Sequence, residues 1–184
     1  MKRTTTTSLI TVICGFYLLQ LLNPSIEDRL LLINKAILSD GAIHGVATGE
    51  WYRILTVALV HGSLMHLGFN MYALLVLGNP IEAAFGRNRF LAIFFISLTT
   101  GSLTSLYLNA SNQASVGASG ALFGLFGAMA VVGKRIGADV KSILVIIGIN
   151  FAMGFVLSGI DWHAHLGGLV GGVLASKILL RQRR

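Results

Sequence analysis

Long apolar runs alternate with short polar stretches along almost the whole chain. A helix crosses the hydrocarbon of a bilayer in about 20 mostly apolar residues. Six runs approach this length, with approximate limits 6–22, 57–78, 90–108, 118–133, 141–158 and 162–180. The pattern predicts an all-α polytopic membrane protein, with one bundle of six transmembrane helices forming a single domain over residues 1–184.

The longest section between two predicted spans runs from residue 23 to about residue 56. It is not simply polar, because "DRLLLINKAIL" is amphipathic and "GEWYR" places aromatic residues beside charges. Sequences of this kind lie in the headgroup region rather than crossing it. We therefore expect a long interfacial first loop.

Composition and charge narrow the class further. Apolar residues make up 54% of the chain and charged residues only 11%, whereas a soluble domain carries roughly 25% charged residues. The net charge of +7 could suggest a nucleic-acid partner, but the basic residues are distributed unequally between the two sets of loops. One set of loops and both termini hold most of the basic residues: Lys2, Arg3, Arg87, Arg89, Lys134, Arg135, Lys141, Lys177, Arg181, Arg183 and Arg184.

The opposite set of loops holds three basic residues (Arg29, Lys35, Arg53) and five acids (Glu27, Asp28, Asp40, Glu50, Asp161). This asymmetry is the positive-inside bias. It predicts cytoplasmic termini, three outward loops, the lipid bilayer as a partner and no nucleic acid.

Polar residues within the apolar runs are the candidates for function, because they are expensive at membrane depth. The second run carries His61, His66 and Asn70, the fourth opens with Ser119, and the sixth carries His165. His66 and Asn70 are four residues apart and share a helical face. Counted along each helix from the charged residue at its cytoplasmic end, the distance is roughly 22 Å to Ser119, roughly 24 Å to His66 and roughly 18 Å to His165. All three segments therefore place their polar residues at a similar level.

Small residues line the fourth and sixth runs at helical spacing: Gly120, Gly124 and Gly127 in one, and Ala164, Gly168 and Gly172 in the other. Such residues let helix backbones approach closely in lipid. Close approach would bring the Ser119 hydroxyl within reach of His165, and a serine needs such a base to become a nucleophile. The Ser119 N–H at the helix start, with His66 and Asn70, could stabilise an oxyanion. Gly117 keeps the entrance to this helix uncrowded.

The arrangement resembles the rhomboid family of intramembrane serine proteases. The family's G-x-S-G pattern appears as Gly117 to Gly120, H-x-x-x-N as His66 to Asn70, and A-H-x-x-G as Ala164 to Gly168. Two further elements match: Tyr52-Arg53 in the first loop, and Gly78, Glu82 and Gly86 at the inner end of the second run. The resemblance covers essentially the whole chain, in the basic six-span form.

The resemblance implies a serine endopeptidase that cuts membrane-anchored proteins within or near their transmembrane segments. Ser119 would be the nucleophile and His165 the base, with an oxyanion site formed by Ser119, His66 and Asn70. Phe123 would pack on the imidazole, and His61 would support the site from behind. Arg53 and Glu82 would hold loops in place.

We expect a bacterial plasma membrane and, because of the charge topology and the need for water at the serine, an active site opening to the outside; the resemblance implies no cofactor. The natural substrate and the oligomeric state stay open.

Other classes fit the sequence less well. A non-catalytic rhomboid relative that binds transmembrane helices would lack the serine or the histidine, and both are present here. A small-solute transporter is disfavoured because the chain has no convincing internal repeat and its polar residues gather on one side. A metal site built from the histidines lacks a carboxylate or thiol at ligand spacing.

Overall fold

The structure is a computed structural model that describes residues 4–156 and 159–181. The predicted charges at Lys2, Arg3, Arg183 and Arg184, and the last two residues of the fifth predicted span, lie outside these ranges.

Helices dominate the described chain, which confirms the all-α prediction. Five helices are long and apolar enough to cross a membrane: α1 (Thr5–Leu22), α4 (Leu64–Phe85), α5 (Arg87–Leu108), α6 (Ser119–Val132, continued by the 3-10 turn η3, Gly133–Ile136) and α8 (Trp162–Arg181). A sixth apolar helix, α7 (Val140–Val156), is shorter. The described residues thus form a polytopic helical bundle whose order agrees with the six predicted runs.

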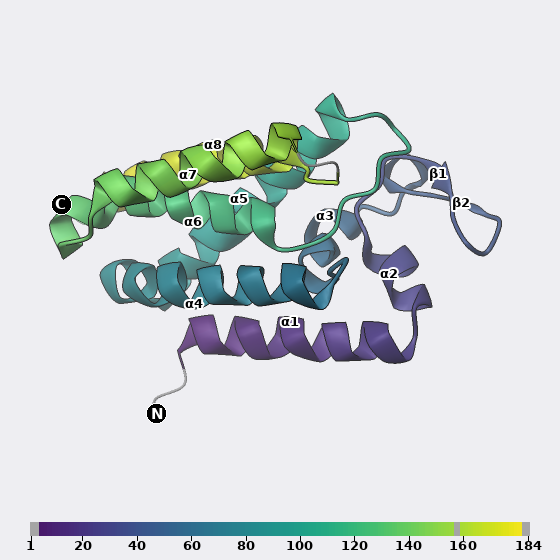
Figure 1. Ribbon diagram of the computed structural model, residues 1–184, viewed down its shortest axis with the longest axis horizontal. Coiled ribbons are helices and arrows are strands. Elements are labelled where there is room, and N and C mark those ends of the chain that lie inside the picture. Colours follow the sequence, from purple (N-terminus) through teal and green to yellow (C-terminus); the bar gives the residue numbers. More distant parts are fainter. Residues whose placement is uncertain (1–3, 157–158, 182–184) are drawn as a thin grey trace.

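Helix α6 lies at the centre of the bundle and is the most buried of the long helices. It contacts α4, α5, α7 and α8, while α1 packs against α4 on the outside (Figure 1). The start of α1 and the end of α8 lie at the left end of the view, and the first loop lies at the right end. The first and last helices thus begin and end at the same side of the bundle, as expected when the chain crosses it an even number of times.

The first loop is built from short elements rather than a continuous coil. They are α2 (Ser25–Leu30), β1 (Ala36–Ile37), β2 (Ile43–His44), the 3-10 turn η1 (Val46–Thr48), α3 (Arg53–Thr56) and the 3-10 turn η2 (Val57–Leu59). The strands β1 and β2 form an antiparallel hairpin. Leu32 and Ser115 exchange two backbone hydrogen bonds of 3.0 and 2.8 Å. This bridge joins the first loop to the segment that leads into α6.

Helix α4 differs from its predicted limits of 57–78, because it begins and ends seven residues later. The hydroxyl of Ser63 accepts a hydrogen bond of 3.1 Å from the His66 N–H and so caps the helix. A serine at this position satisfies one of the free N–H groups of the first turn, which favours a helix start here. His61 consequently lies before α4 and not inside it, which corrects the prediction that places it in the second span.

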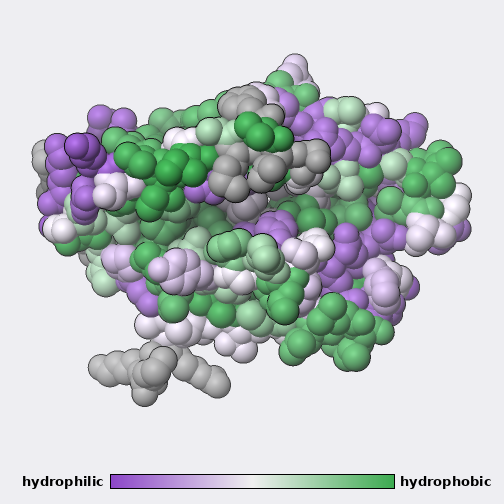
Figure 2. All heavy atoms as spheres, in the orientation of Figure 1, coloured by the Kyte–Doolittle hydropathy of each residue, from purple (hydrophilic) through white to green (hydrophobic). Residues whose placement is uncertain are grey.

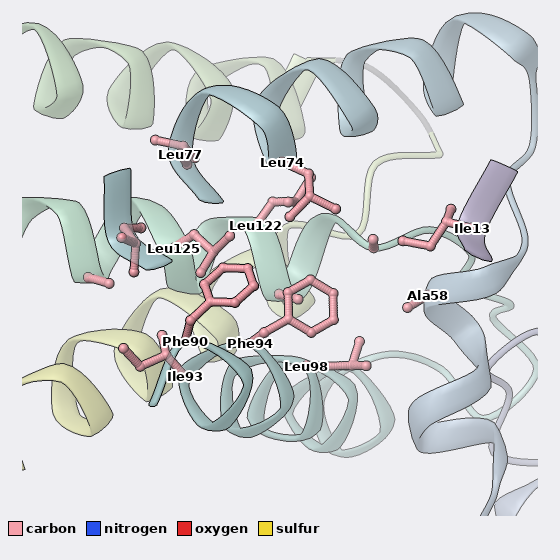
Figure 3. Close-up of a cluster of buried hydrophobic side chains, with 14 of the residues drawn as sticks. Ile13, Ala58, Leu74, Leu77, Phe90, Ile93, Phe94, Leu98, Leu122 and Leu125 are labelled. Carbon is pink, nitrogen blue, oxygen red and sulfur yellow. The ribbon is translucent and has the colours of Figure 1, made fainter. Parts of the chain in front are cut away.

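The apolar core lies between α4, α5 and α6. Phe90 and Phe94 of α5 point toward Leu122 and Leu125 of α6, and Leu74 of α4 closes the cluster (Figure 3). On the visible surface, hydrophilic residues gather at the left end and again over the first loop at the right (Figure 2). Many exposed side chains on the helices between these ends are large and apolar, as expected of a surface that contacts lipid.

Candidate active site

Helix α8 approaches α6 so closely that their backbones touch. A Cβ atom built on Gly168 would lie 1.9 Å from the carbonyl oxygen of Gly120, and one on Gly172 would lie 2.1 Å from that of Gly124. No side chain fits into such gaps, so these positions require glycine. The predicted close approach of the fourth and sixth runs is confirmed, and we call this contact the glycine seam (Gly120, Gly124, Gly168 and Gly172).

A second face of α8 packs on α5 in the same way. A Cβ atom on Gly167 would lie 2.2 Å from the hydroxyl of Thr104, and one on Gly171 would lie 2.1 Å from that of Thr100. The threonine hydroxyls donate to carbonyl oxygens of α5 itself, one turn earlier. Helix α8 therefore lies in a groove between α5 and α6.

The glycine seam brings Ser119 and His165 together. Ser119 is the first residue of α6, and its Oγ lies 3.0 Å from Nε2 of His165 near the start of α8. The ring of Phe123, one turn after Ser119, stacks on the imidazole with 4.0 Å between centroids and 9° between planes. Among the described residues, Nδ1 of His165 is buried without a hydrogen-bond partner. The geometry is that of a serine–histidine pair without a third residue bonded to the ring.

His66 lies beside the turn that precedes the serine. Gly117 has φ of +107°, a conformation that favours glycine, and a Cβ atom there would lie 2.7 Å from Cε1 of His66. The ring of His61 packs edge-on against the ring of His66, with 5.1 Å between centroids. Gly117 is thus required by both its backbone conformation and the space that His66 occupies.

Asn70 is buried on α4, but its described hydrogen bond is local. Its Nδ2 donates to the carbonyl oxygen of His66 on the same helix at 2.9 Å. One N–H of the amide group remains for another acceptor. Of the two predicted oxyanion side chains, His66 lies against Gly117. Among the described residues, Asn70 makes no hydrogen bond to Ser119.

Gln20, which the sequence analysis did not single out, holds His61 in place. Its side-chain amide donates to the His61 carbonyl oxygen at 2.9 Å and accepts from the His61 N–H at 3.1 Å. Gln20 lies on α1 and is buried. A polar side chain within an apolar run was the available signal, since such residues are expensive in lipid and usually have a partner.

Arg53 binds backbone groups of the first loop. The guanidinium is 1% exposed, and its Nη1 donates to the carbonyl oxygens of Asp28 and Leu31 at 2.7 and 2.8 Å. Its Nε donates to the carboxylate of Glu50 at 2.7 Å. Glu50 also contacts His44, whose other ring nitrogen lies 2.9 Å from Asp40.

These contacts shift the pKa values of Glu50 and His44 in the first loop. Burial raises the pKa of Glu50, but hydrogen bonds from His44, Arg53 and the Gly45 N–H outweigh it and lower the pKa to about 2. The hydrogen bonds to Glu50 and Asp40 raise the pKa of His44 above its ordinary value. We call Asp40, His44, Glu50 and Arg53 the loop charge cluster.

Glu82 lies away from this site, near the end of α4 where α1 begins. Its carboxylate accepts hydrogen bonds from the N–H groups of Thr5 and Thr6 and from the Thr6 hydroxyl, at 2.8 to 2.9 Å. The prediction that Glu82 holds a loop is corrected: it binds the first turn of α1, where a carboxylate satisfies free N–H groups.

A small cavity opens beside Ser119. Its lining includes Leu32 and Ser115 from the bridged segments, Val57 before α4, Leu98 and Ser102 from α5, and Ala164 from α8. The wall therefore combines parts of the first loop with three helices. With a volume of about 10 Å³, the cavity offers room for about one water molecule next to the serine hydroxyl.

Comparison with known protein families identifies the fold to which these residues belong. The model of the rhomboid domain matches residues 48–182. The chain belongs to the rhomboid family. The matched segment includes Arg53, His61, His66, Asn70, Ser119 and His165, and it begins within the first loop.

Relatives of the chain come from bacteria and plants. It is 41% identical over 142 residues to the rhomboid protease GluP of Bacillus subtilis (strain 168), covering 73% of this chain and 27% of GluP. It is 34% identical over 144 residues to YdcA of the same organism, covering 76% of this chain and 72% of YdcA. RHOMBOID-like protein 5 of Arabidopsis thaliana is 37% identical over 144 residues, covering 73% of this chain and 46% of the plant protein. GluP and the plant protein are thus more than twice as long as the segment they share with this rhomboid.

Proposed function

We propose that this rhomboid is an intramembrane serine endopeptidase that uses Ser119 and His165 as a catalytic dyad. The observation that carries the proposal is the 3.0 Å contact between Ser119 Oγ and His165 Nε2. Three features support it: the stacked Phe123 ring, the cavity beside the serine, and the similarity to the rhomboid protease GluP.

The proposed reaction begins with attack of Ser119 Oγ on the carbonyl carbon of the scissile peptide bond. Nε2 of His165 takes the hydroxyl proton and then gives it to the leaving amine, which leaves an acyl group on the serine. A water molecule hydrolyses the acyl-serine with His165 again acting as base. Because water must reach this depth, the polar residues around Ser119 are expected to face the outer aqueous phase.

The negative charge on the tetrahedral intermediate requires hydrogen-bond donors. The Ser119 N–H is one of the free donors at the start of α6. We propose the His66 ring, which lies against Gly117, as a second donor, and the remaining N–H of Asn70 as a third. Preorganised donors of this kind are usually worth about 10²- to 10³-fold in turnover each.

The proposed substrates are membrane-anchored proteins. The positions of the charged loops favour cytoplasmic termini, which would place the first loop and Ser119 toward the outer side. Peptide bonds in a substrate helix are protected by internal hydrogen bonds until the helix unwinds, and glycine or proline makes unwinding easier. We therefore expect cleavage in the outer third of the substrate span or just beyond it, next to a small residue.

The decisive experiment combines covalent labelling with substrate cleavage. Purified protein in detergent is treated with a fluorescent fluorophosphonate, and reconstituted protein is incubated with a single-span substrate whose products are mapped by mass spectrometry. Ser119→Ala and His165→Ala should each abolish labelling and nearly all cleavage. The double variant should lose little more, because the two side chains act as a unit.

Ser8→Ala is the matched control, because Ser8 is an exposed serine on α1. It should label and cleave like the unchanged protein. Substantial turnover by folded Ser119→Ala would refute the nucleophile, and a cut in the cytoplasmic half of the substrate would refute the proposed orientation. Binding of the substrate without any cleavage would favour the alternative, a non-catalytic rhomboid that holds transmembrane helices.

A further inference from the structure

Asp161 caps the helix that carries His165. It directly precedes α8, and its Oδ1 accepts a hydrogen bond of 3.0 Å from the Ala164 N–H. Its backbone carbonyl oxygen accepts a hydrogen bond of 3.2 Å from the His165 N–H. Aspartate is among the preferred residues at this position because it satisfies a free donor and carries negative charge at the positive end of the helix dipole. Asp161 therefore defines the first turn of α8, one turn before the imidazole.

The same carboxylate also binds the last turn of α5. Oδ2 of Asp161 accepts from the Ser105 hydroxyl at 2.5 Å, and Oδ1 accepts from Asn109 Nδ2 at 3.0 Å. Asn109 completes the connection, since its Oδ1 lies 2.5 Å from Nδ1 of His163 on α8. Burial raises the pKa of Asp161, but the hydrogen bonds from Ser105, the Ala164 N–H and Asn109 outweigh it and hold the pKa below its ordinary value. The ionised carboxylate of Asp161 therefore accepts hydrogen bonds both from α8 and from the end of α5.

His165 depends on its helix for its position. Its ring has one described hydrogen bond, to Ser119, and one stacked neighbour, Phe123. Among the described groups, no partner contacts Nδ1 from behind. The glycine seam allows α8 to come close to α6, and further along α8 the side chains of Thr100 and Thr104 pack over Gly171 and Gly167, but the first turn of α8 needs a restraint at its own end. The connection between Asp161 and α5 supplies that restraint at the end of α8 where the imidazole lies.

We propose that Asp161 is the positioning residue of the dyad. By fixing the first turn of α8 against the last turn of α5, it holds His165 within hydrogen-bond distance of Ser119. A serine protease triad orients its histidine by a direct bond to the ring, whereas here the carboxylate acts through the helix backbone. The inference rests on the proposed protease function for its kinetic consequences, and on the helix contacts alone for its structural ones.

The test compares four purified proteins reconstituted in the same lipid: the unchanged chain, Asp161→Ala, Asp161→Asn and Thr6→Val. Asp161→Ala removes the cap and the bonds to α5. Asp161→Asn keeps an acceptor for the Ala164 N–H, and the Ser105 hydroxyl can accept from the new amide. Thr6→Val is the control for stability, because it removes a buried hydroxyl that donates to Glu82 at the far end of the bundle.

A small displacement of a catalytic group costs about 10²-fold in rate. We therefore expect Asp161→Ala to lower kcat by about 10- to 100-fold, with KM changed less than about threefold, because the substrate contacts remain. Asp161→Asn should recover most of kcat, and Thr6→Val should keep the kcat of the unchanged protein. Hydrogen exchange followed by mass spectrometry should show faster exchange in peptides covering residues 162–168 of Asp161→Ala only.

Two results would overturn the proposal: a folded Asp161→Ala protein with unchanged kcat, or a loss confined to KM. Equal loss of kcat in Thr6→Val would also overturn it, because the effect would then follow stability. If the unchanged chain and Ser119→Ala are equally inactive, the protease function fails. Hydrogen exchange then decides the positioning role by itself: faster exchange limited to 162–168 supports it, and unchanged exchange refutes it.

Discussion

The glycine seam and the loop charge cluster hold neighbouring parts of this rhomboid by opposite means. At the seam, Gly172 of α8 lies so near the backbone of α6 that a Cβ atom would approach Gly124 Cα to 2.4 Å. At the cluster, the buried Arg53 guanidinium binds Glu50, and Glu50 binds His44. The seam contains no charge, and the cluster depends on charge.

The difference follows from the surroundings of each region. Lipid provides no hydrophobic driving force between helices, so close backbone contact and van der Waals packing must stabilise the seam. The cluster lies in the first loop, where charged groups can keep partial contact with water and bury only some of their surface. We therefore expect larger side chains at the seam to destabilise the protein strongly, with an effect that does not depend on pH. The contribution of the cluster to stability should instead depend on pH and less on side-chain size.

The largest effect is expected from adding a side chain to the seam. Gly172→Leu should prevent folding, because the nearest obstacles are backbone atoms of Gly124 that cannot turn aside as a side chain can. The matched control is Gly148→Leu on α7, where a Cβ atom would meet nothing within 4 Å. Gly148→Leu should leave stability within about 1 kcal/mol, as substitutions away from packed contacts usually do. Yield of monodisperse protein and thermal unfolding in detergent measure both, and a well-folded Gly172→Leu protein would contradict the seam.

A smaller effect is expected from breaking the charge cluster. Arg53→Ala leaves Glu50 without its guanidinium partner and the carbonyl oxygens of Asp28 and Leu31 without their Arg53 donor. Removing one partner of a buried ion pair costs about 3–5 kcal/mol, and the partial exposure of Glu50 favours the lower end. Arg53→Lys should recover little, because an ammonium cannot reproduce the fork of guanidinium donors.

The matched control for Arg53 is Arg29→Ala, since Arg29 is exposed on α2. Its stability should stay within about 0.5 kcal/mol of the unchanged protein. Thermal unfolding of the three variants at one pH makes the comparison. Equal stability of Arg53→Ala and Arg29→Ala would show that the cluster does not hold the loop.

The smallest effect is a change of loop stability with pH. Because its folded pKa is raised, protonated His44 contributes fully below the unfolded value of about 6.5, and the contribution disappears as pH rises through the folded pKa. The stability difference between the unchanged chain and His44→Gln should therefore be largest in mild acid and shrink toward alkaline pH. At the other extreme, the contribution of Glu50 is present above about pH 4.5 and is lost as the pH falls toward about 2.

Thermal unfolding of both proteins across this range measures the effect. Gly127→Ala, on the same helix as Gly120 and Gly124, serves as the reference, because its destabilisation comes from packing against Leu169 and Val173 of α8 and should not vary with pH. A His44→Gln difference that stays constant across the range would show that His44 acts by packing instead of charge.

Much of the bundle could be predicted from local sequence. Among the described residues, runs of apolar residues identified the five membrane-length helices and the shorter apolar helix α7, and the limits of α1 and α8 agree with prediction to within one residue. The start of α4 was wrong, because the prediction joined the apolar residues 57–60 to the run that begins at Leu64, across His61, Gly62 and Ser63. Only the side-chain cap at Ser63 decides where that helix begins. The expected pairing of Ser119 with His165 followed from depth and glycine spacing, both of which are properties of single helices.

Partnerships between distant segments could not be predicted in the same way. Gln20 binds the backbone of His61 across 41 residues, and Asp161 binds Ser105 across 56 residues. Its place directly before the sixth predicted run marks Asp161 as a helix cap, but nothing in the sequence near it indicates that it also binds α5. Its role depends on which helix end lies opposite, and that is a property of the assembled bundle.

The sequence by itself determined which segments are helices, which ends carry positive charge, and which residues are small enough for close contact. These features arise from hydropathy, charge and side-chain size, which each residue carries in any context. The tertiary structure alone decided that α8 lies in the groove between α5 and α6 and that Asp161 joins α8 to α5. It also decided that the Glu82 carboxylate binds the first turn of α1. Within α4, it decided that Asn70 donates to the carbonyl oxygen of His66. A hydrogen bond needs two groups within about 3 Å in the right orientation, and only the packed bundle fixes the positions of groups so far apart in the chain.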